Sequence, residues 1–494
     1  MAIQGNEYFR NMLTDPNDYD RLLMFKNVNK LLDHCVEQFP DSYSVQWAEG
    51  KKTFSDLKND VDKVVALLKN NNVKKNDVVG LLFRNEYDFI TSFFACSRIG
   101  AVAALLPLSL PNEVIERLSH LFTYHTIIFN DFSKERFETI KTLTLINASA
   151  AKDLEPSNEE VDVLPNDPAC IVFTGGTTGN PKGALLSHKN LCRGALNGAY
   201  TPGNPFNHKY LSLIPFTHIF GLVKNLLSSI LSGSTLYLCP NPTNFAREAA
   251  VYQPDTMVLT PGLAAMVLTL LQTYSVHMFG PAFKCIIAGG ANVPPKLIKD
   301  FKKLDIDCFP GYGLTEATNL VSGNIDIASK PDSVGIAYPG QEVKVVDNEL
   351  WVKGDNVFLG YFNNPVATNA ILIDGWLHTG DLAKIDEEGY IYILGRINNL
   401  IVLASGLKIV PEEIEFEINT HPLVKDSIVR KAINNDSIEA EVLLNKNDEE
   451  GQKQVTDFIY NEVNNKINGD IKVTKIIFRN EDFKRTPAMK IVRE

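Results

Sequence analysis

The sequence of 494 residues lacks an excess of positive charge, since 48 Lys and Arg are set against 59 Asp and Glu and the net charge is −11. Nucleic acids and anionic membranes attract basic protein surfaces, so this balance argues against a general binder of either partner. An anionic ligand must instead be bound by donors gathered locally at one site.

Cysteine is scarce and no uninterrupted apolar run is long enough to span a membrane. The seven cysteines are odd in number, widely spaced and never CxxC, so neither a disulfide framework nor a zinc site is indicated. The most apolar stretch, Ile90 to Pro111, is interrupted by Arg98 and Gly100, which favours a buried helix followed by a strand. The polar N-terminus shows no signal-peptide pattern, so we expect a cytoplasmic protein with no transmembrane segment.

No internal repeat or low-complexity segment is present, and the length predicts at least two domains. Apolar residues spaced by three and four predict two amphipathic helices within residues 28–72, separated by a hairpin at 42–54. Short apolar runs alternating with helical segments from 77 to 313 predict βα-type sheets with helices on their faces.

After Lys330 the sequence pattern changes to that of short strands joined by tight turns, among them the DEEG turn at 386–389. This pattern predicts a β-rich subdomain. After Arg396 the pattern becomes mixed α and β, with a helix behind Pro411. The predicted fold is therefore α/β, with a large N-terminal domain at 1–396 and a small C-terminal α+β domain at 397–494.

The densest chemical signal is the segment IVFTGGTTGNPKG at 171–183, in which an apolar strand runs into a loop of Gly, Thr and Lys. Glycines let the backbone N–H groups approach phosphates, hydroxyls donate to phosphate oxygens, and a lysine adds a positive charge. A Walker-type loop is excluded because Lys182 is followed by Gly183 rather than by Ser or Thr. The expected phosphate-binding residues are Thr174, Gly175, Gly176, Thr177, Thr178, Gly179 and Lys182.

This loop resembles the phosphate-binding loop of the AMP-forming adenylating superfamily, which contains acyl-CoA synthetases, adenylation domains and beetle luciferases. Further motifs follow in the family's order, and the resemblance extends from about Val161 to the C-terminus. These motifs are PFTHIFGL at 215–222, AGGANVPP at 288–295, GYGLTEAT at 311–318, TGD at 379–381, ILGR at 393–396 and FKRTPAMKIVRE at 483–494.

The resemblance implies a role for residues in each motif. His218 lines the entry of the carboxylate to the adenylation site, Thr315 contacts the α-phosphate, and Glu316 binds magnesium, an ion that prefers oxygen ligands. Lys490 is the catalytic lysine that reaches the acyl carboxylate and ribose oxygens. The remaining residues implied in ATP or AMP binding are Gly289, Gly290, Ala291, Gly311, Tyr312, Gly313, Asp381 and Arg396.

A mobile small domain is also implied by the resemblance, with its hinge at Asn398 and a thiol channel at Ser405, Gly406 and Leu407. Three positions depart from the family pattern. The family usually has Ser at Gly175, Gly at Met489, and Asp or Lys at Asn398.

The function implied is that of an acid–thiol ligase that uses ATP and Mg²⁺ to form an acyl-adenylate and then transfers the acyl group to coenzyme A, as in fatty acid metabolism. A ligase that loads an acyl carrier protein is the alternative. A luciferase-type oxygenase and a non-catalytic nucleotide binder are less favoured readings of the same scaffold. Fatty and aryl acids both remain open, with Phe216, Phe220, Tyr312 and Leu314 as candidate apolar walls that core packing explains equally well.

Overall fold

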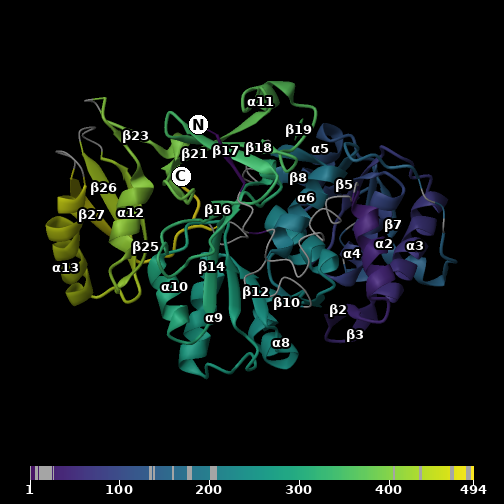
Figure 1. Cartoon of the computed structure of the whole chain (residues 1–494), viewed down its shortest axis with the longest axis horizontal. Helices are drawn as coiled ribbons and strands as arrows, with labels where there is room; N and C mark the ends of the chain where they lie inside the picture. Colours follow the sequence, from purple (N-terminus) through teal and green to yellow (C-terminus); the bar gives the residue numbers. More distant parts are fainter. Residues whose placement is uncertain are drawn as a thin grey trace.

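The computed structural model describes residues 2–5, 9, 25, 27–132, 136, 140–157, 159, 161–174, 181–200, 208–403, 406–432, 437–467, 472–485 and 491–493. Within these residues the strands form two large sheets, a smaller hairpin-rich sheet and, toward the C-terminus, a three-stranded and a two-stranded sheet. In Figure 1 the C-terminal sheet lies at one side of the molecule and the N-terminal helices at the other. The mixed α/β fold class, with a C-terminal α+β part, is confirmed.

The first large sheet has the order β19-β9-β8-β5-β4-β6-β7. Strands β8, β5, β4, β6 and β7 are parallel neighbours, and every residue of β4 is buried, as expected for an apolar run covered on both faces. Antiparallel β9 and β19 extend one edge. The strand bounds are β4 Val78–Leu81, β5 Val102–Leu105, β6 Thr126–Phe129, β7 Thr144–Asn147, β8 Pro168–Thr174, β9 Lys182–Ser187 and β19 Gly360–Tyr361.

The second large sheet has the order β16-β15-β14-β13-β12-β10-β11-β2-β3. Its centre from β14 to β11 is parallel, whereas β2 and β3 form an antiparallel hairpin at one edge. The strand bounds are β2 Tyr43–Trp47, β3 Gly50–Thr53, β10 Lys209–Ser212, β11 Thr235–Leu238, β12 Thr256–Leu259, β13 Cys285–Ala288, β14 Asp307–Tyr312, β15 Ser322–Gly323 and β16 Ile336–Ala337.

Helices cover the faces of both sheets (Figure 1). The two predicted amphipathic helices form on either side of the β2–β3 hairpin, and the second is held at its start by a capping box between Thr53 and Asp56. The apolar stretch forms a buried helix followed by β5, and its Arg98 is paired with Asp33 and Asp62. The helices are α2 Val28–Gln38, α3 Phe54–Asn70, α4 Tyr87–Arg98, α5 Asn112–Leu121, α6 His188–Ala199, η4 Gly221–Leu227, α7 Ser228–Leu231, α8 Phe245–Tyr252, α9 Pro261–Thr273 and α10 Pro295–Lys302.

The hairpin-rich sheet confirms the predicted β-rich stretch after Lys330. Its order is β1-β17-β18-β21-β20, with β22 paired to β21 across the predicted DEEG turn. At that turn the Gly389 N–H donates to the Asp386 carbonyl over 3.0 Å. The bounds are β1 Ile3–Gln4, β17 Gln341–Val346, β18 Glu349–Gly354, β20 Leu372–Ile373, β21 Trp376–Ile385 and β22 Ile391–Arg396, and α11 Pro365–Asn369 precedes β20.

The C-terminal part combines helices with the sheet β25-β26-β27. Its apolar side chains form a separate hydrophobic cluster between Ile401 and Phe478. The helix predicted behind Pro411 is present. The elements are η7 Ile397–Asn399, β23 Ile401–Val402, β24 Lys408–Ile409, α12 Pro411–Asn419, β25 Val424–Lys431, β26 Ile438–Leu444, α13 Glu449–Phe458, η8 Ile459–Val463, α14 Asn464–Lys466 and β27 Val473–Arg479.

None of the helices in the described part of the chain combines the length and the apolar composition needed to cross a membrane. 

Candidate active site

The predicted phosphate loop joins two antiparallel strands. Strand β8 ends at Thr174 and β9 begins at Lys182, and these two residues lie opposite each other in the ladder. The Thr174 hydroxyl donates to the Lys182 carbonyl over 3.4 Å. The loop residues between them, Gly175, Gly176, Thr177, Thr178 and Gly179, lie outside the described residues. The hairpin therefore presents Thr174 and Lys182 side by side at the base of the loop.

Lys182 and Glu316 are linked through a tyrosine that neither motif contains. The Lys182 Nζ atom lies 4.9 Å from the ring centroid of Tyr361, and the Tyr361 hydroxyl donates to Glu316 Oε1 over 2.6 Å. Burial, followed by the Glu316 carboxylate, raises the pKa of Tyr361. The phenol therefore remains protonated and holds one carboxylate oxygen in place.

The position of Tyr361 follows from sheet pairing. Strand β19 pairs with β9, so Tyr361 lies opposite Ala184, two residues beyond Lys182. Just before β19, the Phe358 N–H donates to the Glu316 carbonyl over 2.9 Å. The segment before β19 thus joins the GYGLTEAT motif to the phosphate-loop hairpin.

The same GYGLTEAT segment reaches the TGD motif through its tyrosine. The Tyr312 hydroxyl donates to Asp381 Oδ2 over 2.5 Å, and Arg396 Nε donates to Asp381 Oδ1 over 2.8 Å. Burial and the Asp381 carboxylate raise the pKa of Tyr312 well above its usual value. The Asp381 side chain is 4 % exposed and that of Arg396 is 55 % exposed, so a buried carboxylate lies beside an accessible guanidinium.

Asp381 is held by the local structure of its own strand. The Thr379 hydroxyl donates to the Leu350 carbonyl over 2.7 Å and accepts from the Asp381 N–H over 3.1 Å. Gly380 has a φ of +71°, a conformation that favours glycine, and its N–H donates to Glu349 Oε1. Thr379 and Gly380 therefore fix the backbone around Asp381, whether or not they also contact a ligand.

His218 lies at the start of the segment that carries Phe220. The backbone N–H of Phe220 donates to His218 Nδ1 over 3.2 Å. The backbone N–H of His218 itself donates to the Pro215 carbonyl over 2.9 Å. Because Nδ1 accepts this bond, the neutral ring carries its proton on Nε2. The imidazole is thereby held in one orientation next to a residue of the cavity wall.

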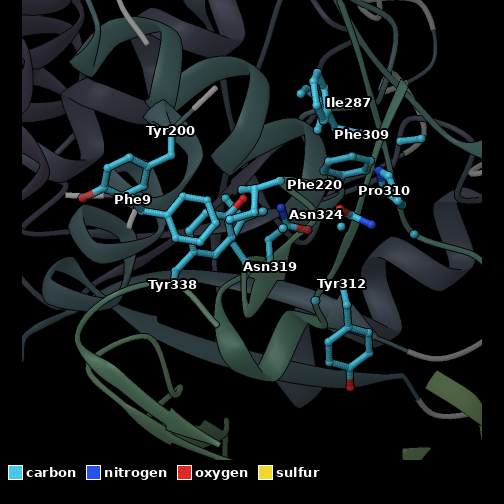
Figure 2. A pocket seen from close by; sticks show the side chains of 18 residues that line it. Phe9, Tyr200, Phe220, Ile287, Phe309, Pro310, Tyr312, Asn319, Asn324 and Tyr338 are labelled. Carbon is cyan, nitrogen blue, oxygen red and sulfur yellow. The ribbon is translucent and has the colours of Figure 1, made fainter. Parts of the chain in front are cut away.

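A cavity of about 540 Å³, its open mouth included, lies at the ends of β13 and β14. Figure 2 shows side chains from sequence-distant segments around it. Its lining includes residues 287–290 and 309–313, together with Phe9, Tyr200, Phe220, Asn319, Asn324 and Tyr338.

Most of the predicted turn residues belong to this cavity. Gly289, Gly290, Gly311, Tyr312 and Gly313 line it, whereas Ala291 is exposed beside it. Gly313 tolerates no side chain, since a Cβ there would lie 1.0 Å from the Asn319 carbonyl oxygen.

Of the four candidate apolar walls, two belong to the cavity. Phe220 and Tyr312 line it, while Phe216 and Leu314 are not among the lining residues. Phe216 instead packs in the core, with its ring centroid 5.3 Å from that of Phe89. Thr315 begins the short helix η6 (Thr315–Ala317) directly after the cavity-lining turn, which brings it beside Glu316.

The predicted hinge and thiol-channel residues lie beyond β22. Asn398 lies in η7, the short helix that begins directly after Arg396. Leu407 is 46 % exposed. Gly406 has a φ of +82° and no atom within 4 Å of the position of a Cβ. Ser405 and the predicted catalytic Lys490 lie outside the described residues.

Several residues of the site are absent from the sequence prediction. Tyr361 follows a glycine in a short apolar run, and nothing local connects it with Glu316. Asn319, Tyr200 and Tyr338 occur next to motifs or element ends and carry no distinctive spacing, and Phe9 lies in a polar segment.

The donor set fits a magnesium–nucleotide complex. No group of three or more His, Cys, Asp or Glu side chains suited to a metal is found in the described part of the chain. Magnesium bound to a nucleotide requires only one or two protein carboxylates, because phosphates and water complete its coordination. Glu316, with one oxygen fixed by Tyr361, meets that requirement.

The comparison with known families agrees with this geometry. The sequence model of the family described as AMP-binding enzyme matches residues 32–362. The chain belongs to the AMP-binding enzyme family, and the resemblance predicted from the motifs is confirmed.

Individual relatives are acid–CoA ligases. The chain is 28 % identical over 406 residues to a 2-succinylbenzoate–CoA ligase of Bacillus cereus, which covers 78 % of this chain and 82 % of the relative. A solved anthranilate CoA ligase in complex with anthranoyl-AMP superposes with a TM-score of 0.85 at 21 % identity, over 94 % of this chain and 95 % of the other. The o-succinylbenzoate CoA synthetase of Bacillus subtilis with ATP and magnesium gives a TM-score of 0.81 at 23 % identity, over 93 % and 98 %.

Proposed function

We propose that the protein is an AMP-forming acid–CoA ligase, which activates a carboxylic acid to an acyl-adenylate with release of pyrophosphate and then transfers the acyl group to coenzyme A. The observation that carries this proposal is the pair of hydrogen bonds made by one segment. Tyr312 reaches Asp381 over 2.5 Å, and Glu316 is bonded to Tyr361 over 2.6 Å beside Lys182. The 311–318 segment thus carries the cation ligand Glu316 and, through Tyr312, contacts the ribose-type acceptor Asp381 of the TGD motif.

Asp381 is proposed to bind the ribose of ATP. Its carboxylate is held in place by Tyr312 and Arg396, and an ionised carboxylate is a strong hydrogen-bond acceptor for the ribose hydroxyls. The accessible Arg396 guanidinium is proposed to reach the ribose or phosphate oxygens. Gly289, Gly290 and Ala291 are proposed to pass between adenine and the acyl group, at the edge of the cavity.

Glu316 is proposed to hold Mg²⁺, which offsets negative charge on the phosphates when it is bound. Thr315, next to it in η6, is proposed to donate to the α-phosphate. Lys182 and Thr174 at the base of the loop, with Gly175, Gly176, Thr177, Thr178 and Gly179, are proposed to bind the other phosphates. Lys490 is proposed as the lysine that stabilises charge on the reacting oxygens.

We also propose the division into a domain of residues 1–396 and a mobile domain of residues 397–494. The separate apolar cluster from Ile401 to Phe478 supports it, because a domain needs its own core. Rotation at Asn398 would bring Ser405, Gly406 and Leu407 toward the incoming thiol. A cytoplasmic location is proposed together with this function, since coenzyme A and ATP are intracellular substrates.

The proposal is tested by pyrophosphate release with ATP, Mg²⁺ and a panel of acids from acetate to palmitate and substituted benzoates, with and without coenzyme A. We expect release that depends on one class of acid, acyl-CoA as the product, and loss of adenylation in Lys490→Ala. Acyl transfer to a carrier protein but not to coenzyme A would instead identify a carrier-loading ligase. Absence of release with every acid, despite ATP binding, would contradict the proposal.

A further inference from the structure

The N-terminal segment contributes to the cavity although it precedes the part of the chain that the family model matches, residues 32–362. Strand β1 pairs with β17, placing Ile3 opposite Val343 and Gln4 opposite Glu342, and the Gly5 N–H donates to the Gln341 carbonyl over 2.7 Å. Four residues later, Phe9 is 2 % exposed and lines the cavity. The segment is therefore anchored on one sheet and places an aromatic ring in the pocket.

Phe9 packs against two tyrosines that also line the cavity. Its ring centroid lies 4.4 Å from that of Tyr338 and 5.4 Å from that of Tyr200, and the two tyrosines stack at 6.0 Å. Figure 2 shows these three rings gathered on one side of the pocket. Tyr200 follows α6 and Tyr338 follows β16, so three sequence-distant segments form one aromatic wall.

The nucleotide side of the pocket lies away from this wall. In Figure 2 Tyr312, whose hydroxyl bonds to Asp381, lies at the opposite side from Phe9 and Tyr200. An adenylate with its ribose at Asp381 therefore directs its acyl group along the pocket toward the three rings. The side chain of Asn319 lies between the Tyr312 side of the pocket and the aromatic wall. Asn319 is 7 % exposed, and its buried Nδ2 has no hydrogen-bond partner in the described structure.

We infer that Phe9 is a specificity-determining residue that closes the acyl end of the pocket, so that compact acids fit and long-chain acids do not. This inference rests on the proposed acid–CoA ligase function and adds to it a limit on the substrate. Because the Phe9 ring packs against both Tyr200 and Tyr338 in a packed interior, it cannot move aside without disturbing both contacts, and we therefore expect affinity to fall sharply for acids that reach it.

The inference is tested with two non-reactive adenylate analogues, benzoyl- and palmitoyl-sulfamoyladenosine, whose dissociation constants are measured by calorimetry. This readout requires no turnover. The wild-type protein is expected to bind the benzoyl analogue at least about tenfold more tightly than the palmitoyl one. Phe9→Ala is expected to reduce that ratio by about tenfold or more, and Phe9→Trp to increase it, because the first enlarges the pocket and the second fills it.

Two further variants keep the test decisive. Phe9→Leu retains an apolar side chain and shifts the ratio in the same direction as Phe9→Ala, even where the alanine variant folds poorly. Phe132→Ala, at a ring that is 61 % exposed and not part of the cavity lining, leaves the ratio unchanged. Thermal unfolding of each variant verifies that folded protein is compared.

The failures of the two proposals are distinguishable. If neither analogue binds to the wild-type protein, the ligase function itself is contradicted, and the inference with it. If both bind and every Phe9 variant changes both dissociation constants by the same factor, the ligase function stands and the role of Phe9 is overturned. Equal binding of the two analogues by the wild-type protein also overturns it.

Discussion

The carboxylate of Asp381 is the side-chain group on which we propose that nucleotide binding depends most directly. It is nearly buried and is fixed by Tyr312 and Arg396. Asp381→Asn removes a charged acceptor, and because hydrogen bonds to charged groups contribute about 1.5–3 kcal/mol, we expect ATP affinity to fall by about tenfold to a hundredfold. Calorimetric titration with ATP measures the change. Asp374→Asn, at an exposed turn before β21, is the matched control and should bind ATP normally.

Tyr361 is the second residue with a clear expected effect, and its role is to position Glu316. Tyr361→Phe keeps the ring beside Lys182 but removes the donor to Glu316 Oε1. We expect the Mg²⁺ concentration for half-maximal pyrophosphate release to rise about threefold to tenfold, since one hydrogen bond to a charged group is lost. A magnesium titration of initial rates measures this.

A merely structural tyrosine would leave the magnesium requirement unchanged, and that outcome would contradict the assignment of Tyr361. Tyr274→Phe, at a side chain that is 72 % exposed, is the control. Thermal unfolding of both variants separates loss of folded protein from loss of positioning.

At the scale of elements, the phosphate-loop hairpin depends on a glycine that packs closely. A Cβ at Gly183 would lie 2.3 Å from Phe122 Cε1 and 2.7 Å from Ile171 Cγ2. Gly183→Ala is therefore expected to destabilise the protein by about 1–3 kcal/mol through overpacking and to weaken ATP binding by displacing the loop base. Urea unfolding and ATP titration measure the two effects. Gly389→Asn, at a turn with open space around a Cβ, should change stability by less than about 1 kcal/mol, since Asn tolerates positive φ.

The short helix η7 is the second element with a specific expectation, because it contains the proposed hinge. Asn398→Pro fixes φ near −65° and removes the N–H, so it restricts rotation there. We expect adenylation and thioester formation to be impaired unequally, by at least about tenfold in their ratio. Single-turnover measurements of the two half-reactions test this. Asn398→Ala, which keeps the backbone free, should leave the ratio unchanged, and equal losses in the proline variant would argue against a hinge.

For the whole molecule, His188 couples stability to pH. It is buried at the start of α6, where desolvation lowers its pKa from 6.5 to about 4, while Asp167 acts to raise the pKa and Lys75 to lower it. Because the unfolded chain binds a proton on this residue between pH 6.5 and 4 and the folded one does not, the contribution of His188 to the free energy of unfolding is highest above pH 6.5 and falls by about 3 kcal/mol toward pH 4.

Urea unfolding at pH 6.5, 5.5 and 4.5 measures this dependence. In His188→Gln, which cannot be protonated, the slope between these pH values should be smaller than in the wild type. His120→Gln, at an exposed site, serves as the control. An unchanged slope in the His188 variant would show that other groups govern the acid dependence.

The sequence alone determined which elements form and which family motifs are present. The spacing of apolar residues predicted α2, α3 and the hairpin between them, and the run from Ile90 predicted a buried helix, because these patterns depend on neighbours within a few residues. The motifs also singled out Asp381, Arg396 and Glu316, and the glycine turns that line the cavity.

Only the tertiary structure decided which residues of the site contact one another. Tyr312 bonds to Asp381 across 69 positions and Tyr361 to Glu316 across 45, and these contacts depend on how separate sheets pack rather than on any local period. For the same reason the sequence did not predict Phe9 as a pocket residue. It is a lone aromatic residue in a polar segment, and it lines the pocket because β1 pairs with β17. Side-chain contacts between distant segments are set by the relative placement of whole elements, and no short stretch of sequence records that placement.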